Sequence, residues 1–186
     1  MDENSGKVTG YHYTNSKAYS SIRDGKKNGQ TALIPRSRFI SLTKGNGLPD
    51  EAHKGVIGGL LEPEPKSWLQ NPEFPFLWNV LMDDICREND ITLLSFEINP
   101  KDEAYIAERA HVERELYREA KGRGKPTRQS MDGALRKYWE SRVPVFDYDG
   151  SYLLPQLAIF TPIEFQRLKV EWIKSVDDIL VGLHKK

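Results

Sequence analysis

Gly10-Tyr-His-Tyr-Thr14 and Tyr152-Leu-Leu-Pro-Gln-Leu-Ala-Ile-Phe-Thr161 are the two stretches that decide how this chain is read. Each alternates in the manner of a β-strand. Each also carries polar residues where a core strand ordinarily has apolar ones. We expect the two strands to lie side by side and to line one cleft, although they are far apart in the sequence.

The composition is that of a single globular domain. The chain has 186 residues, 38% of them hydrophobic, which is enough to bury a core without disulfides or a metal. Lys and Arg total 27, as do Asp and Glu, so broad electrostatic capture of nucleic acid is not expected, although a local patch stays open. The single cysteine excludes an internal disulfide, and the four histidines lack the paired spacing of a zinc site.

The polar N-terminus does not resemble a signal peptide, and no apolar run approaches the roughly 20 residues of a membrane span. We therefore expect a cytoplasmic protein that does not enter a membrane. Export without an N-terminal signal stays open as an alternative.

The remaining pattern mixes short strands with helices. Periodicity and capping residues predict helices over 15–24, 77–86, 102–121 and 127–141 and a last helix from Ser175. The first of these has an N-cap at Asn15 or Ser16 and ends at Gly25, and the helix at 127–141 has an apolar stripe that we assign to the core: Met131, Leu135, Tyr138 and Trp139. Alternating, branched and aromatic runs predict strands over 8–14, 31–35, 38–43, 56–61, 91–98 and 165–170, and Asp149-Gly150 predicts a hairpin turn. Regular strand–helix alternation is missing, so the expected class is α+β, with a helical segment before the final strands.

His12 and Thr14 are the first candidate site residues. They alternate with Tyr11 and Tyr13 and therefore share one face of their strand. A histidine and a hydroxyl one pleat apart form a fork of hydrogen-bonding groups about 7 Å wide, which suits a planar amide or a ribose diol. The alternative is a purely structural role, in which His12 forms a hydrogen bond with a neighbouring carbonyl.

These stretches resemble the ADP-ribosyltransferase fold, which implies a single domain with a split, mostly antiparallel sheet, flanking helices and a helical insertion at about 100–142. Tyr11-His-Tyr-Thr14 with its following helix resembles the family's first motif, which implies that His12, Tyr13 and Thr14 contact NAD. Arg38-Phe-Ile-Ser-Leu-Thr43 resembles the second motif, with Phe39 and Ser41 beside the nicotinamide. The stretch from Asp149 to Ile163 resembles the third, which implies a catalytic position at residue 156. The function implied is mono-ADP-ribosyl transfer from NAD to a macromolecule, as in a toxin or effector.

Gln156 departs from that family at the position of its catalytic glutamate. A carboxylate there stabilises the positive charge that builds on the ribose, whereas an amide carries no charge and cannot act as a base. The alternatives are a transferase that uses another acid, a module that only binds NAD or a partner, and a deliberately inactivated enzyme. Nearby substitutes for the carboxylate are Asp147, Asp149 and Glu164.

Two sets of charged residues are the remaining candidates for functional sites. Lys121, Arg123, Lys125 and Arg128 lie in one short segment without an acidic residue. This segment is either a solvated loop or a contact for phosphate or an acidic partner, which would fit an NAD-using transferase of RNA ends or 2′-phosphates. Glu113 and Glu115 have the spacing of a Glu-x-Glu motif but fall in a helical pattern, so we interpret them as solvated charges.

Overall fold

The computed structural model describes residues 7–25, 31–35, 37–38, 48–75, 77–78, 90–119 and 121–175. Within these ranges the chain is a mixed α and β protein with mostly antiparallel sheets, as predicted. The sequence-predicted positions Phe39 and Ser41, the 77–86 helix beyond residue 78 and the helix after Ser175 lie outside the described residues.

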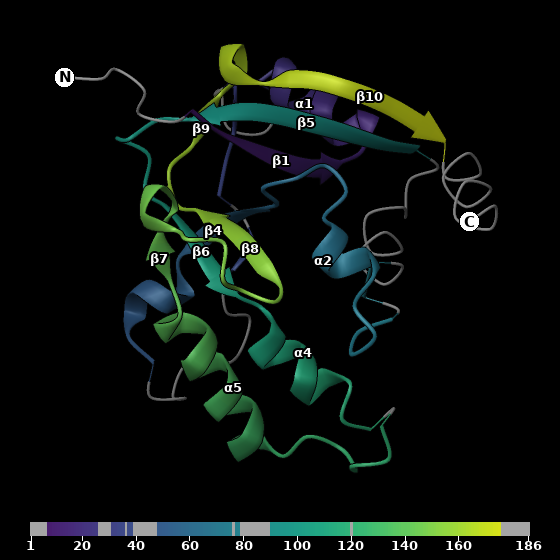
Figure 1. Cartoon of the computed structure of the whole chain (residues 1–186). Helices are drawn as coiled ribbons and strands as arrows, with labels where there is room; N and C mark the ends of the chain where they lie inside the picture. The colour runs from purple at the N-terminus through teal and green to yellow at the C-terminus, as the bar shows by residue number, and fades with distance from the viewer. Residues whose placement is uncertain are drawn as a thin grey trace.

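A three-stranded antiparallel sheet forms one side of the molecule (Figure 1). Its order is β1–β5–β10, with bounds β1 Val8–Thr14, β5 Asp90–Ile98 and β10 Lys169–Ser175. The predictions for the strands at 8–14 and 91–98 are therefore confirmed. The predicted 165–170 strand is displaced, because a 3-10 turn, η3 Phe165–Arg167, precedes β10.

A second, five-stranded sheet lies below the first in Figure 1. Its order is β3–β4–β8–β6–β7, with bounds β3 Ser37–Arg38, β4 Gly55–Gly59, β8 Pro155–Ile159, β6 Ala104–Glu108 and β7 Val143–Pro144. A small separate pair joins β2 Ala32–Leu33 to β9 Ile163–Glu164. The two larger sheets meet at Tyr11 and Leu60, which exchange two backbone hydrogen bonds of 2.9 Å.

Gly59 makes this junction possible. A Cβ atom at this position would lie 2.7 Å from the Tyr11 carbonyl oxygen and 3.3 Å from the Leu157 side chain. Contacts at those distances are too close for a side chain, so only glycine lets β1 approach the end of β4 this closely. The close approach of the two sheets therefore depends on the absence of a side chain at Gly59.

Four helices are described around the sheets: α1 Ser16–Arg23, α2 Lys66–Leu69, α4 Ala110–Leu116 and α5 Arg128–Glu140. The Asn15 side chain caps α1, and Gly25 follows it with a φ of 62°, as predicted. Thr127 and Ser130 form a capping box at α5, which confirms the helix predicted at 127–141. Two further 3-10 turns are η1 Asp50–His53 and η2 Val145–Asp147.

The predicted helix over 102–121 is wrong in its first part. Residues 104–108 form β6, which pairs with both β8 and β7, and the helix begins only at Ala110. The segment 100–142 is therefore not a purely helical insertion, because it supplies a central strand to the second sheet. The hairpin predicted at Asp149-Gly150 is also wrong, since the strands on either side of it both pair with β6.

The core lies on both faces of the second sheet. Between the two sheets, Phe96 and Ile98 of β5 pack against Leu157 and Ile159 of β8. On the other face, α5 packs Leu135, Tyr138 and Trp139 onto Ala107 and Ala158, so the sequence-predicted apolar stripe of this helix is confirmed as core. A third cluster surrounds Trp68 and Phe74. No helix in the described part of the chain is long and apolar enough to span a membrane.

Candidate functional site at the junction of the two sheets

The two strands that carry the candidate residues are not neighbours. The expectation that they lie side by side is wrong, because β1 pairs with β5, whereas β8 pairs with β4 and β6. β4 lies between them, and its residue Gly58 accepts a hydrogen bond from one candidate and lies near the other. The His12 Nδ1 atom lies 2.7 Å from the Gly58 carbonyl oxygen, and a Cβ atom on Gly58 would lie 3.7 Å from the Gln156 Nε2 atom. We call His12, Gly58 and Gln156 the sheet junction.

His12 is held in one tautomer by this contact. A carbonyl oxygen only accepts, so Nδ1 donates its hydrogen to Gly58. Burial lowers the pKa of His12, and the hydrogen bond to Gly58 opposes this only in part. The imidazole is therefore neutral at pH 7, and its Nε2 atom carries a lone pair that has no hydrogen-bond partner within the described residues. Nε2 is thus an acceptor for an amide or hydroxyl hydrogen.

Thr14 and Tyr13 have different surroundings. Thr14 is half-buried opposite Thr92 of β5, and the strand alternation places it on the face of His12. Tyr13 lies on the other face, where it is 8% exposed and its hydroxyl donates to the Pro63 carbonyl. The structure therefore keeps His12 and Thr14 together, as predicted, and places Tyr13 in the core beside Trp78.

Gln156 is fixed by two donors. The Tyr138 hydroxyl donates to its Oε1 atom at 2.5 Å, and Arg109 Nη1 donates to the same atom at 3.3 Å. A carbonyl oxygen has two lone pairs, so both are in use. The Nε2 group, with its two hydrogens, is the part of the amide that faces Gly58. Gln156 therefore presents a donor at the sheet junction and not an acceptor.

Arg109 is itself held by Glu113. Its Nε atom donates to the Glu113 carboxylate at 2.6 Å, and its guanidinium lies 5.7 Å from the centre of the Trp68 ring. Glu113 is 2% exposed, so the interpretation of this residue as a solvated charge is wrong. Its burial is compensated by the charge of Arg109. We call Glu113, Arg109, Gln156 and Tyr138 the Gln156 network.

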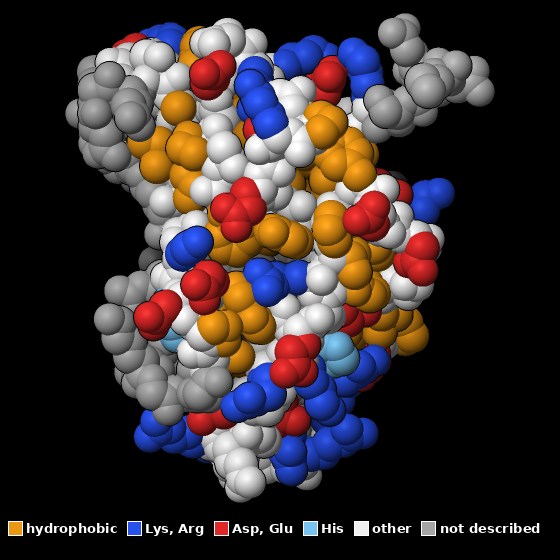
Figure 2. All heavy atoms as spheres, turned by 90° about the vertical axis from the view of Figure 1, so that its left-hand side faces the viewer, with side chains coloured by type: hydrophobic (Ala, Val, Ile, Leu, Met, Phe, Trp, Pro, Cys, Tyr) orange, Lys and Arg blue, Asp and Glu red, His pale blue; other side chains and the backbone are white. Residues whose placement is uncertain are grey.

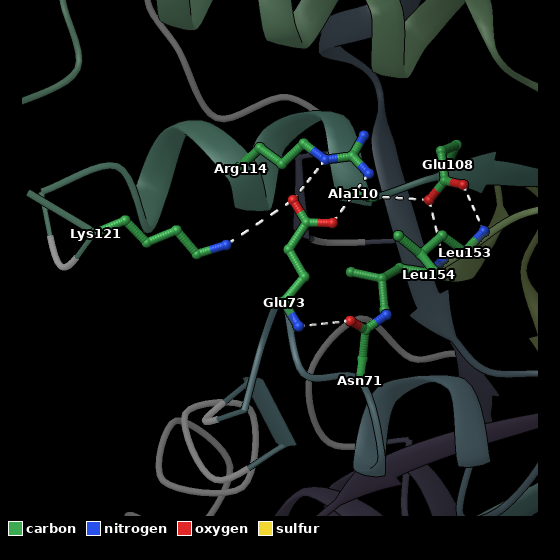
Figure 3. A network of polar contacts seen from close by, with 8 residues as sticks. All are labelled: Asn71, Glu73, Glu108, Ala110, Arg114, Lys121, Leu153 and Leu154. Atoms are coloured by element: carbon green, nitrogen blue, oxygen red, sulfur yellow. Dashed lines mark hydrogen bonds and ion pairs between the residues drawn. The ribbon is translucent and has the colours of Figure 1, made fainter. Parts of the chain in front are cut away.

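Glu108 fixes the backbone on either side of this network (Figure 3). Its carboxylate accepts hydrogen bonds from the backbone N–H groups of Ala110, Leu153 and Leu154, at 3.0, 2.6 and 2.9 Å. These bonds tie the start of α4 to the turn that leads into β8, two residues before Gln156. Glu108 is 9% exposed, and three N–H donors replace the water that its charge has lost.

The sequence did not single out Glu108, Arg109 or Tyr138. Glu108 and Arg109 fell inside the wrongly predicted helix, where charged residues read as a solvated face. Tyr138 was assigned to the core stripe of its helix, which is correct for its ring but leaves out its hydroxyl. The sequence held one signal for these residues. In 106–113 charged residues stand directly beside apolar ones, and this mixture is unusual for a central strand and the helix that follows it.

The candidate substitutes for a carboxylate at position 156 do not join the network. Asp147, Asp149 and Glu164 are all exposed. Asp149 accepts from the backbone of Ser151, and Glu164 accepts from the side chain of Gln166. Within the described ranges, no hydrogen bond connects any of the three to Gln156. The acid closest in this network is Glu113, which acts through Arg109.

The basic segment lies where predicted, in the connection between α4 and α5. Lys121 is 3.9 Å from Glu73, whose carboxylate is already paired at 2.8 and 3.1 Å with Arg114 (Figure 3). Lys and Arg side chains gather at this lower end of the molecule in Figure 2. Among the described residues, no group of His, Cys, Asp and Glu side chains is arranged to hold a metal ion.

Comparison of this chain with family models, with curated proteins and with solved structures gave no match.

Proposed function

We propose that this protein binds NAD at the sheet junction, in an arrangement of the ADP-ribosyltransferase kind. The observation that carries the proposal is the convergence of His12 and Gln156 on Gly58, from strands of two different sheets. Within the described residues, neither His12 Nε2, an acceptor, nor Gln156 Nε2, an amide donor group, has a hydrogen-bond partner. Nicotinamide and its ribose offer the complementary amide hydrogens, carbonyl oxygen and hydroxyls.

Three further features support the proposal. In the described part of the chain, the two larger antiparallel sheets meet at the bridge between Tyr11 and Leu60, which fits the split sheet expected from the resemblance. His12 and Thr14 share one face of β1, as the family's first motif requires. The neutral state of His12 suits a neutral amide or hydroxyl ligand better than a protonated imidazole would.

The hydrogen bonds of Gln156 favour binding of NAD over transfer of its ADP-ribosyl group. Both lone pairs of its Oε1 atom are occupied, so the amide cannot accept a ribose hydroxyl hydrogen without losing Tyr138 or Arg109. An amide also supplies no negative charge to a ribose that becomes positive. Within the proposal, NAD is therefore bound and not consumed by this chain, and ADP-ribosyl transfer to a macromolecule is the second candidate.

The binding experiment compares two histidine variants by calorimetric titration with NAD. In His12→Asn, the shorter amide can still donate to Gly58 from the place of Nδ1 but has nothing in the place of Nε2. Loss of one hydrogen bond of about 1.4 kcal/mol corresponds to roughly tenfold weaker binding. His53→Asn makes the same chemical change in η1, outside the junction, and is expected to bind NAD like the wild type. Equal affinities for wild type and His12→Asn would reject the proposal.

Transfer is tested by Gln156→Glu, with release of nicotinamide followed over hours. A carboxylate at this position can keep both donors and adds the missing charge. NAD cleavage that appears only in Gln156→Glu would identify a domain disabled at this one position. Cleavage by the wild type would favour the transferase, and no cleavage by either chain would favour a pure binder.

A further inference from the structure

Positive charge is concentrated in one part of a chain that is neutral as a whole. Residues 121–142 contain seven Lys and Arg residues and two acids, whereas the full chain has 27 of each kind. These residues form the α4–α5 connection and the whole of α5. They lie together at the lower end of the molecule, where blue side chains dominate the surface in Figure 2.

Within the described residues, five of these seven charges have no carboxylate at ion-pairing distance, and one of the five, Arg142, is half-buried over the Trp139 ring. Glu73 is engaged by Arg114 and Lys121, and Arg128 has Asp132 at 3.8 Å. Within the part of the chain that the structure describes, no carboxylate pairs with the remaining cations of the connection and of the outer side of α5, which are Arg123, Lys125, Arg136 and Lys137. All four are exposed. We call them the basic face.

A groove follows the same side of α5. It has a volume of about 600 Å³ and is lined by Arg128, Gln129, Asp132, Gly133 and Arg136. Nothing lies within 4 Å of the point where a Cβ atom on Gly133 would stand, so the groove is open over the middle of the helix. Two arginines, Arg128 and Arg136, and one acid, Asp132, therefore line an open groove.

The lining favours phosphates over a protein partner. Protein interfaces are anchored by large apolar or aromatic side chains, and none of the exposed large hydrophobic residues lies between 121 and 142. The aromatic rings of α5, Tyr138 and Trp139, are buried, so no ring in this segment is available for stacking on unpaired bases. Exposed Lys and Arg side chains alone are suited to a regular row of phosphates.

We propose that the basic face binds double-stranded nucleic acid through its phosphate backbone. This inference concerns binding alone and does not depend on the NAD reaction. The two sites are nevertheless connected by α5, whose outer side carries Arg136 and whose inner side carries Tyr138, the donor to Gln156.

The test is fluorescence anisotropy of a labelled 20-base-pair duplex of mixed sequence, titrated with the full chain from 50 to 200 mM salt. Four phosphate contacts give a slope of log K against log[salt] of about −3 to −4. In the double variant Arg123→Glu and Lys125→Glu, we expect affinity at least tenfold lower and a slope shallower by about 2. Lys7→Glu with Lys169→Glu makes the same charge change on the β1–β5–β10 sheet and is expected to bind like the wild type.

Circular dichroism of each variant shows whether it is folded. Three results would overturn the proposal: no duplex binding by the wild type, equal loss in the two double variants, or binding of a single strand as tight as that of the duplex. Displacement of the duplex by an equal concentration of polyglutamate would assign the basic face to an acidic polypeptide instead. A failure of NAD binding in the calorimetric experiment leaves each of these readouts unchanged, so the two proposals fail separately.

Discussion

Removal of the Tyr138 hydroxyl should lower the free energy of unfolding by a defined amount. Tyr138 is 4% exposed, and its hydroxyl donates to Gln156 Oε1 at 2.5 Å. In Tyr138→Phe the ring stays in place, and Oε1 keeps Arg109 at 3.3 Å as a donor. The cost is therefore that of one net hydrogen bond, about 1 to 1.5 kcal/mol, and not that of an acceptor left bare.

Tyr117→Phe is the matched control with the opposite sign. The Tyr117 hydroxyl is buried and has no hydrogen-bond partner within the described residues. The same change from Tyr to Phe here removes an unsatisfied polar group, so we expect the free energy of unfolding to rise by about 1 kcal/mol. The two variants make the same chemical change, one at the end of α4 and the other within α5.

Urea unfolding, followed by circular dichroism, measures both effects. With a slope of about 2 kcal/mol per molar urea, Tyr138→Phe should lower the midpoint by about 0.5 to 0.7 M, and Tyr117→Phe should raise it by about 0.5 M. If both variants shift the midpoint in the same direction, or if Tyr138→Phe leaves it unchanged, the Gln156 network does not stabilise the protein as described.

Three further predictions test other parts of the structure. Glu108→Gln turns an amide NH₂ toward one of three backbone donors, so it should lower the free energy of unfolding by about 2 to 4 kcal/mol in the same urea experiment. Gly59→Ala places a Cβ atom 2.7 Å from the Tyr11 carbonyl and should cost about 3 kcal/mol, seen as a lower thermal midpoint and faster backbone hydrogen exchange at this bridge. Because burial lowers the pKa of His12 in the folded state, the unfolded state binds more protons below about pH 6.5, so stability should be complete above that pH and decline as the pH falls through it. His111 is shifted in the same direction, so thermal scans from pH 8 to 5 should show a smaller decline in His12→Asn than in wild type, and an additive effect for His111→Gln.

Local signals predicted the elements that the sequence specifies by itself. The alternation in 8–14 and the branched run at 91–98 gave strands that the structure confirms. The caps expected at Asn15 and Gly25 gave the correct ends of the first helix, and the helix expected from Thr127 has its N-cap there. In each case the residues that decide the structure lie within one turn or one pleat of each other.

The failures come from pairing between distant segments. Ala104-Tyr-Ile-Ala-Glu108 has helix-forming residues, and it becomes a strand because β8 and β7 supply hydrogen bonds on both of its edges. The same tertiary pairing places β4 between β1 and β8, which no local pattern in 55–59 reveals. Propensity is a weak guide wherever a strand is bonded on both sides.

For the candidate site, the sequence pointed to His12 and Gln156 but not to what holds them. Gly58 contributes a carbonyl oxygen to His12 and, in place of a side chain, space beside Gln156 Nε2, and no local pattern in the Gly58-Gly59 pair predicts either feature. Arg109 and Tyr138 reach Gln156 from two different helical segments. Their role follows from the packing of α5 on the second sheet, which is a property of the folded chain.

The most direct test of NAD binding at the sheet junction is nitrogen NMR of the His12 imidazole, titrated with NAD. The free protein should show a neutral ring with the hydrogen on Nδ1 and a bare Nε2, and the Nε2 resonance should move in a saturable way as NAD is added. His53 serves as the internal reference and should not move. A hydrogen on Nε2 in the free protein, or an Nε2 resonance unchanged at saturating NAD, would contradict the account.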